Sequence, residues 1–340
     1  MKMSFKDTLG RTLRDLRISV TDRCNFRCPY CMPAEIYGEK YNFLPKPEIL
    51  TFEEIIRLTK VFVEIGITKV RLTGGEPLIR KNIEELVAGI SSIPGVEDLA
   101  LTTNGFLLSD KAWALKKAGL NRITVSLDSI DPAIFKTMNG RGYGPDKILD
   151  GIRAAEAVGL SPVKVNAVVQ KGVNDSHIVE LARYFRHTSV IVRFIEYMDV
   201  GNLNKWNSNE VVLAGDIVKL IDHELPLKLL TSNYGGEVAA RYGYKDGSGE
   251  IGIISSISQP FCGDCTRARI STDGKLITCL FATGGTDLKA LLRNGSADHE
   301  LQKAIVNVWA KRTDRYSEER MYDIRKPNST KKIEMYQIGG

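Results

Sequence analysis

Three cysteines near the amino terminus, Cys24, Cys28 and Cys31, fall within eight residues at the spacing Cx3Cx2C. Thiolates packed this closely in a chain generally bind metal. A structural zinc site needs a fourth nitrogen or sulfur ligand, whereas the nearest histidine, His177, lies more than a hundred residues further along. The spacing therefore favours a four-iron cluster with one iron left open. A structural zinc site and unrelated core cysteines are the alternatives.

A second triplet, Cys262, Cys265 and Cys279, lies in the carboxyl-terminal part of the chain. The next histidine is His299, so a zinc ribbon would lack a nearby fourth ligand. We expect a second cluster with an open iron, and zinc that keeps a water as its fourth ligand is the alternative. Two groups of three cysteines do not look like a disulfide framework, and a reducing compartment would keep them free for metal.

The residues after Cys265 have the period-two pattern of a strand, over 266–272. Alternation would place Arg267, Arg269 and Ser271 on one face of that strand, next to the second triplet. Paired guanidinium groups suit a phosphate chain. A solvated strand face is the ordinary interpretation of such a pattern, but the adjacent cysteines favour a phosphate-binding face.

The elements that must position these groups alternate between strand and helix. Helical periodicities separate six apolar runs, and Thr51 with Glu54 predicts a capping box at the start of the first helix. Six βα units predict a parallel sheet with helices outside, either an open doubly wound sheet or a partial barrel. The predicted strands are residues 15–20, 69–73, 98–103, 122–127, 163–169 and 190–195.

Both architectures gather functional residues at the carboxyl ends of their strands. Residues 73–77 read Thr-Gly-Gly-Glu-Pro, in which paired glycines let the backbone approach a ligand closely and Glu76 adds a carboxylate. The other residues near these strand ends have ordinary interpretations too, since Asn104 with Gly105 is a turn signal and Ser126 or Asp128 could cap a helix, but together they predict a site at one rim of the sheet. They are Thr102, Asn104, Ser126, Asp128, Lys164, Asn166, Arg193, Glu196 and Met198.

The first triplet, with Tyr30 before its last cysteine, and residues 73–77 resemble the radical S-adenosylmethionine (SAM) superfamily. The resemblance implies an α/β fold, a partial six-unit (βα)6 TIM-like barrel. It implies a cluster on the first triplet whose open iron chelates SAM, and one electron from that cluster splits SAM to methionine and a 5′-deoxyadenosyl radical. The implied cofactor-binding residues are Tyr30, Gly74, Gly75, Glu76, Ser126 and Met198.

The second triplet with its paired arginines, residues 19–24 and the terminal Gly339 and Gly340 narrow the resemblance to the GTP-cyclising family that begins molybdenum cofactor biosynthesis. This implies a second [4Fe-4S] cluster on the second triplet, with its open iron on the guanine of GTP. The residues implied to hold the rest of the nucleotide are Arg17, Arg71, Thr102, Lys164, Arg267, Ala268 and Arg269.

The same resemblance implies a lyase reaction. The 5′-deoxyadenosyl radical takes the hydrogen from ribose C3′ of GTP, and the carbon radical attacks C8 to give (8S)-3′,8-cyclo-7,8-dihydroguanosine 5′-triphosphate. An external electron donor and a downstream pterin-forming enzyme are the implied partners. Terminal glycines are usually a frayed end, but in this family they reach into the cavity, which implies a catalytic role for Gly339 and Gly340.

Composition restricts the remaining choices. The 340 residues can bury a large core. The apolar runs are too short to cross a bilayer and the first residues lack the core of a signal peptide, so we expect a cytoplasmic protein with no membrane partner. The sequence contains no long run of lysine and arginine that would indicate binding to nucleic acid. A net charge of +6 fits a phosphorylated ligand. A homodimer is compatible with the sequence.

The βα pattern ends after about residue 200. We therefore expect residues 1–230 to form the partial barrel with the first cluster. Residues 231–340 would then form a smaller α+β region that carries the second cluster and the Gly-Gly tail and closes the barrel mouth.

Two other functions fit part of the pattern. A different radical SAM enzyme with an auxiliary cluster, such as one that modifies peptides, would normally show more than three cysteines after residue 230. A non-catalytic metal module that binds nucleic acid or passes electrons leaves residues 73–77 unexplained.

Overall fold

The computed structural model describes residues 5–323 and 331–339, and the strands of this part form a single twelve-stranded sheet. Its order is β12-β11-β10-β1-β2-β3-β4-β5-β6-β9-β8-β7, and neighbouring strands from β1 to β6 are parallel. The six predicted strands are confirmed, with ends that move by at most one residue. They are β1 (Asp15–Ser19), β2 (Lys69–Thr73), β3 (Asp98–Thr103), β4 (Arg122–Ser126), β5 (Lys164–Val169) and β6 (Ile191–Glu196).

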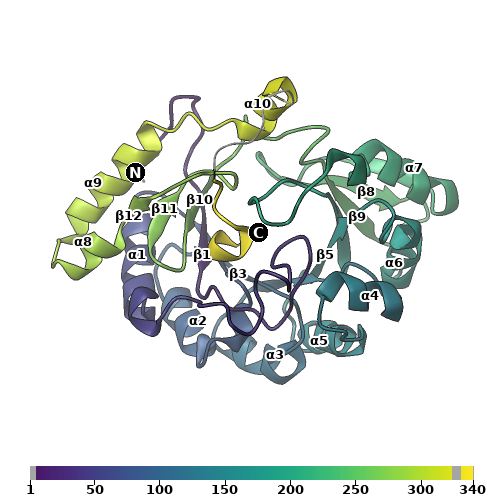
Figure 1. The fold of residues 1–340 in the computed structure, drawn as a ribbon, viewed down its shortest axis with the longest axis horizontal. Helices are drawn as coiled ribbons and strands as arrows, with labels where there is room; N and C mark the ends of the chain where they lie inside the picture. Colours follow the sequence, from purple (N-terminus) through teal and green to yellow (C-terminus); the bar gives the residue numbers. More distant parts are fainter. Residues whose placement is uncertain (1–4, 324–330, 340) are drawn as a thin grey trace.

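Helices follow the outer side of the curved sheet, as Figure 1 shows for α1, α2, α3, α5, α6 and α7. Thr51 and Glu54 form the predicted capping box, in which each side chain accepts a hydrogen bond from the other residue's amide. The helices of the βα units are α1 (Phe52–Glu64), α2 (Ile83–Ser91), α3 (Leu108–Lys117), α4 (Pro132–Asn139), α5 (Asp146–Ala157), α6 (Ile178–Phe185) and α7 (Ala214–Glu224). Short 3₁₀ turns are η1 (Lys46–Glu48), η2 (Pro77–Ile79), η3 (Asp175–His177) and η4 (Ser208–Glu210).

The main hydrophobic core lies between the sheet and these helices. Along β5, Val165, Ala167 and Val169 are buried in this core, whereas Lys164 and Asn166 alternate with them and are only partly buried. Successive side chains of a strand point to opposite faces of the sheet. The alternation therefore turns the polar residues of each strand to the concave side.

The carboxyl-terminal strands extend both edges of this sheet. β10 (Arg267–Ile270) lies parallel to β1 and continues into β11 (Lys275–Ile277) and β12 (Thr286–Asp287), whereas β9 (Glu250–Ile254) lies parallel to β6 and is followed by β8 (Ala240–Tyr244) and β7 (Leu227–Leu230). In the described part, hydrogen bonds do not join β12 to β7. The predicted partial barrel is thus confirmed as an open one, and the boundary near residue 230 stays a prediction.

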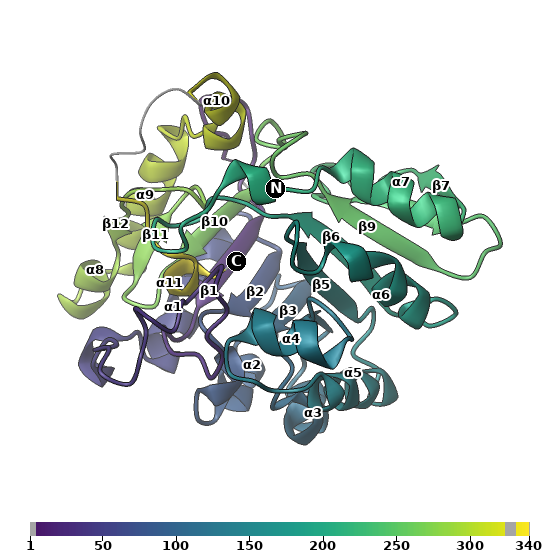
Figure 2. The same ribbon diagram turned by 45° about the vertical axis from the view of Figure 1, so that its right-hand side comes forward.

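The remaining helices lie at the carboxyl-terminal end of the chain. They are α8 (Lys289–Arg293), α9 (Asp298–Ala310), α10 (Tyr316–Asp323) and α11 (Met335–Ile338). Figure 2 shows α11 inside the curve of the sheet, where it contacts β1. Among the described residues, no helix has both the length and the apolar character needed to cross a membrane.

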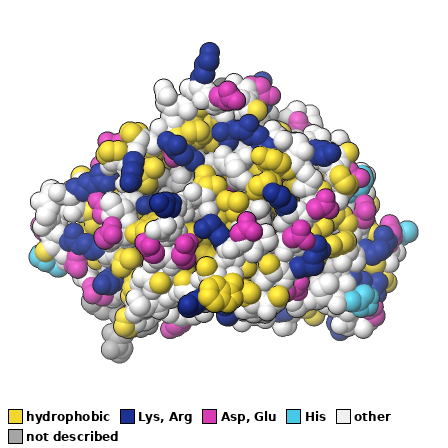
Figure 3. Space-filling view, turned by 90° about the horizontal axis from the view of Figure 1, so that it is seen from below, with side chains coloured by type: hydrophobic (Ala, Val, Ile, Leu, Met, Phe, Trp, Pro, Cys, Tyr) yellow, Lys and Arg dark blue, Asp and Glu magenta, His cyan; other side chains and the backbone are white. Residues whose placement is uncertain are grey.

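One outer face of the molecule, the lower side of Figure 1, is drawn in Figure 3. Lysine and arginine side chains are interspersed there with aspartate and glutamate and with scattered hydrophobic side chains. The excess positive charge of the chain is therefore not concentrated on this face.

Candidate active site

A cavity of about 370 Å³ lies on the concave side of the sheet, and both cysteine triplets line it. Inward-facing residues of β1 to β6, β9 and β10 form its wall, together with the loops at the carboxyl ends of these strands. Most of the predicted site residues meet here. They are Arg17, Cys24, Cys28, Tyr30, Cys31, Arg71, Gly74, Gly75, Thr102, Ser126, Lys164, Met198, Cys262, Cys265, Arg267, Arg269 and Cys279.

Three predicted residues of the described part do not line the cavity. The carboxylate of Glu76 is buried and accepts hydrogen bonds from the Thr103 hydroxyl (2.7 Å) and from the backbone amides of Asn104 (2.7 Å) and Leu78 (2.9 Å). Burial raises the pKa of Glu76 to about 7. Glu76 thus joins the loop after β2 to the loop after β3, and its contact with a cofactor stays a prediction.

The other two are Ala268, whose side chain is buried in the core, and Gly339 in the tail. The guanidinium of Arg269 donates hydrogen bonds to the carbonyl oxygens of Ile338 (3.3 Å) and Gly339. Gly339 has φ +67°, and a Cβ atom there would overlap the Thr73 side chain. The tail therefore passes between β2 and Arg269 where only glycine fits, whereas Gly340 lies outside the described residues.

The paired glycines of residues 73–77 bring two loops together. The amide of Gly75 donates to the carbonyl of Thr21 (2.7 Å), and a Cβ atom at Gly75 would overlap the carbonyl of Arg23. Gly74, with φ +145°, is similarly crowded by Thr21. The backbone that packs closely against these glycines is the segment just before Cys24. The glycines therefore fix the position of the first triplet.

The first triplet lies in a tight turn. The amide of Cys31 donates to the carbonyl of Cys28 (2.9 Å), and the Cys24 sulfur accepts from the amide of Phe26 (3.3 Å). Burial raises the pKa of the Cys24 thiol to about 12 and raises the pKa values of Cys28 and Cys31 as well. Thiolates in such surroundings need compensating positive charge, which the irons of a cluster provide.

The second triplet lies against guanidinium groups. Arg267 and Arg312 each donate from Nη2 to the Cys265 sulfur, at 3.2 Å. Burial raises the pKa of Cys265, but these two cations outweigh it and lower the pKa to about 7, whereas burial raises that of Cys279 to about 11. All six cysteines are free thiols, as ligands of iron must be before a cluster binds. Within the described ranges, no three His, Cys, Asp or Glu side chains converge to hold a single metal ion.

Basic side chains dominate the charge of the cavity. Burial and the neighbouring guanidinium groups lower the pKa of Lys164 to about 8, and those of Arg17 and Arg193 to about 10. An anionic ligand reduces the electrostatic repulsion among such cations and stabilises their charged forms. Among described residues, the basic ones in the lining are Arg17, Lys69, Arg71, Arg122, Lys164, Arg193, Arg241, Arg267, Arg269 and Arg312, and the acidic ones are Asp15, Asp128, Glu196, Glu237, Glu250 and Asp314.

Neutral side chains and one carboxylate orient these cations. Arg71 donates from Nη1 to the hydroxyls of Thr102 (2.9 Å) and Thr124 (3.1 Å), and Arg193 donates from Nε to Asn166 Oδ1 (2.9 Å). Asp98 pairs with Arg122, with Nε and Oδ1 2.7 Å apart. The guanidinium groups are thus held before any ligand binds.

Two lining residues that the sequence did not predict are Lys69 and Arg122, which lie on β2 and β4 before the carboxyl ends of these strands. The rule that functional residues lie at the carboxyl ends of strands does not predict these two positions. Both positions carry the same signal, because Lys69 is two residues from Arg71 and Arg122 is four residues from Ser126, and both of these were predicted site residues. Period-two alternation within the strands would therefore have placed them on the concave side.

Comparisons with known proteins agree with this geometry. Residues 18–185 match the Radical SAM superfamily and residues 190–318 match Molybdenum Cofactor Synthesis C. The chain is 51% identical over 327 residues to a GTP 3′,8-cyclase of Acidothermus cellulolyticus, covering 95% of this chain and 90% of that protein. The chain belongs to the GTP 3′,8-cyclase family. A member of this family from Staphylococcus epidermidis is 48% identical, and the alignment covers all of both chains.

A solved structure supports the fold. SuiB of Streptococcus suis, crystallised with S-adenosylmethionine, matches 94% of this chain and 70% of its own with a TM-score of 0.59 and 17% identity. Membership of the GTP 3′,8-cyclase family and of the radical SAM superfamily implies SAM and [4Fe-4S] clusters as cofactors, as the cysteine spacing predicts. The roles of individual residues in this family member remain predictions.

Proposed function

We propose that this chain is a GTP 3′,8-cyclase, which converts GTP to (8S)-3′,8-cyclo-7,8-dihydroguanosine 5′-triphosphate in molybdenum cofactor biosynthesis. The observation that supports it best is one cavity lined by both cysteine triplets and by more basic than acidic side chains. A reaction between a radical source and a triphosphate nucleotide needs cysteines that hold the clusters and cations that bind the phosphates around the same cavity.

In this proposal Cys24, Cys28 and Cys31 hold one four-iron cluster, and the second triplet holds the other. Bound to the first triplet, a cluster supplies the electron that splits SAM and so provides the 5′-deoxyadenosyl radical. The lining residues Tyr30, Gly74, Gly75, Ser126 and Met198 would contact SAM.

The basic side chains bind the triphosphate. Arg17 and Arg269 lie on β1 and β10, which are adjacent parallel strands with these two residues in register. Arg267 lies two residues before Arg269 on β10 and also lines the cavity. Guanidinium groups on neighbouring strands can form several charge-assisted hydrogen bonds with successive phosphates, so the nucleotide would be anchored along this edge of the sheet.

The remaining contribution of the chain is positioning. Loss of the C3′ hydrogen and closure of the bond from C3′ to C8 each require two carbon atoms held within van der Waals reach in a fixed orientation. A rigid β-sheet wall with pre-oriented side chains such as Arg71 and Arg193 suits that task.

We further propose an external one-electron donor, a downstream pterin-forming enzyme that takes the product, and a cytoplasmic location. A homodimer fits this proposal. Residues 1–230 would form the unit that binds SAM, and residues 231–340 would bring the second cluster and the tail.

Anaerobic incubation of the iron-loaded chain with SAM, dithionite and GTP tests the function. We expect 5′-deoxyadenosine and the cyclic triphosphate to form in equal amounts, and GTP deuterated at C3′ to transfer its deuterium to 5′-deoxyadenosine. Formation of 5′-deoxyadenosine without label from GTP, or no dependence on GTP, would contradict the assignment.

Replacement of Arg17 by alanine should weaken GTP binding by about 1.5 to 3 kcal/mol, the range for hydrogen bonds to charged groups. That is roughly 10- to 150-fold in Kd. Guanosine lacks the phosphates, so its weaker binding should change little. Calorimetry with both ligands measures the difference, and Arg183→Ala, which removes an exposed arginine paired with Glu224, is the control. An equal loss for GTP and guanosine would remove Arg17 from the triphosphate site.

A further inference from the structure

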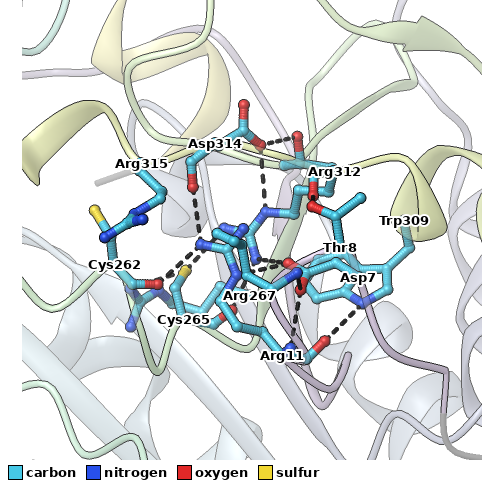
Figure 4. Close-up of polar contacts among 12 residues, drawn as sticks. Asp7, Thr8, Arg11, Cys262, Cys265, Arg267, Trp309, Arg312, Asp314 and Arg315 are labelled. Carbon is cyan, nitrogen blue, oxygen red and sulfur yellow. Dashed lines mark hydrogen bonds and ion pairs between the residues drawn. The ribbon is translucent and has the colours of Figure 1, made fainter. Parts of the chain in front are cut away.

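A buried polar network packs against the second triplet, and two of its members, Arg312 and Asp314, also line the cavity. Figure 4 shows it centred on Asp7, which comes from the amino-terminal segment. The Asp7 carboxylate accepts hydrogen bonds from Arg11 Nε (2.6 Å) and from the amide of Arg11 (2.9 Å), and it forms an ion pair with Arg312 Nη1 (3.5 Å). One carboxylate therefore orients two guanidinium groups that are distant in sequence.

Both guanidinium groups hold the loop of residues 262–265, which we call the CxxC loop. Arg11 Nη1 donates to the carbonyl oxygens of Cys262 (2.9 Å) and Asp314 (2.8 Å), and Arg312 Nη1 donates to that of Cys265 (2.8 Å). Arg312 also donates from Nη2 to the Cys265 sulfur. Backbone and sulfur of the same cysteine are thus bound by one side chain.

Arg312 has little freedom to leave this position. Its Nε contacts Asp314 Oδ2 (3.2 Å), its guanidinium carbon lies 4.6 Å from the centroid of the Trp309 ring, and its side chain is 2% exposed. Trp309 is itself fixed by a hydrogen bond from its indole to the carbonyl of Arg11 (3.1 Å). Every donor nitrogen of Arg312 therefore has a protein acceptor in place.

Arg267 differs in this respect, although it also donates to the Cys265 sulfur. It lies on β10 and lines the cavity, and it is one of the residues predicted to bind the nucleotide. A bound triphosphate can draw Arg267 toward it. Arg312 is the donor to Cys265 whose other nitrogens are all bound by protein acceptors.

We propose that Arg312, oriented by Asp7, is a positioning residue that sets the reduction potential of the cluster on the second triplet by donating to the Cys265 sulfur. The inference rests on the second cluster of the function proposed above. Hydrogen bonds and positive charge at a ligand sulfur stabilise the more negative, reduced state of a cluster and raise its potential. Arg312 therefore makes this cluster easier to reduce.

The test is a redox titration followed by electron paramagnetic resonance. Full-length chains that carry Cys24→Ala, Cys28→Ala and Cys31→Ala isolate the signal of the second cluster. In this background we compare Arg312→Met, which keeps bulk and loses charge, with Arg312→Lys, which keeps charge and loses the fork of donors. Arg293→Met is the control, because it removes an exposed arginine that pairs with Glu54 on the outer surface.

We expect about four irons per chain in each protein. The midpoint potential should become at least 59 mV more negative in Arg312→Met, which is a tenfold change in a one-electron equilibrium. A smaller shift of the same sign is expected in Arg312→Lys and none in Arg293→Met.

An Arg312→Met chain with its irons and an unchanged potential would overturn the proposal. If Arg312→Met does not retain iron, Arg312→Lys decides: a shifted potential supports the proposal, and an unchanged potential or loss of iron there overturns it. The titration needs no GTP turnover, so its result is separate from the test of the cyclase function.

Discussion

Joint replacement of Cys262, Cys265 and Cys279 by alanine is expected to abolish the cyclic product while SAM cleavage continues. The iron content of the anaerobically reconstituted chain should fall from about eight to about four. The first triplet and the Gly74–Gly75 contacts that fix it lie outside the substituted loops, so the radical source stays intact. The resemblance implies that the second cluster binds the guanine of GTP. Without that cluster the nucleotide would be misplaced, and its ribose would no longer face the SAM-derived radical.

Iron analysis, detection of 5′-deoxyadenosine and chromatography of the product measure these three effects on the same preparation. The matched control replaces Cys24, Cys28 and Cys31 and should also lose about four irons, but with complete loss of SAM cleavage. Loss of all iron from the first variant, or one zinc per chain in the unsubstituted protein, would refute the two-cluster arrangement.

Deletion of Gly339 and Gly340 is expected to abolish the cyclic product and leave iron content and GTP affinity nearly unchanged. The carbonyl of Gly339 accepts a hydrogen bond from Arg269, and Arg269 is buried among the cations of the cavity. Without the tail, Arg269 loses a partner that orients it relative to the nucleotide. The radical step depends on sub-ångström positioning, so it should suffer more than binding does.

Two further variants locate the cause. Replacement of Gly339 and Gly340 by alanines keeps the length of the chain but forces a Cβ atom against Thr73 at φ +67°, and it should also lose product. Lys332→Met removes the buried ion pair between Lys332 Nζ and Asp199 Oδ2 (2.7 Å) that anchors the tail upstream, and it should give a partial loss. A truncated chain that forms product at the full rate would identify the glycines as a frayed end.

The sequence alone predicts the strands well, because each of the six is a short apolar run between strong helical periodicities. It also predicts which residues meet, since parallel strands bring their carboxyl ends to one rim. Lys69 and Arg122 were not predicted because the family resemblance does not point to them and because each begins its strand, far from the carboxyl end. The concave face is polar only because it lines a cavity, and the sequence of a single strand does not contain that information.

The network around Asp7 was beyond prediction for a different reason. Asp7 and Arg312 are separated by about three hundred residues, and each is an ordinary surface type of residue by composition. Their burial follows from packing of the amino-terminal segment against α9 and the CxxC loop. Such a contact depends on tertiary structure and produces no periodic pattern in the amino-acid sequence.

The pairing of β1 with β10 has a consequence for how the chain is made. Asp15 pairs with Arg267, so about 250 residues must be synthesised before β1 gains its second neighbour. Until then β1 is a free edge, and the cysteine loop that follows it has one strand beside it instead of two. Edges of this kind recruit other chains. We expect the nascent protein to depend on chaperones until residue 270 has left the ribosome, and the second triplet to receive iron only after that closure.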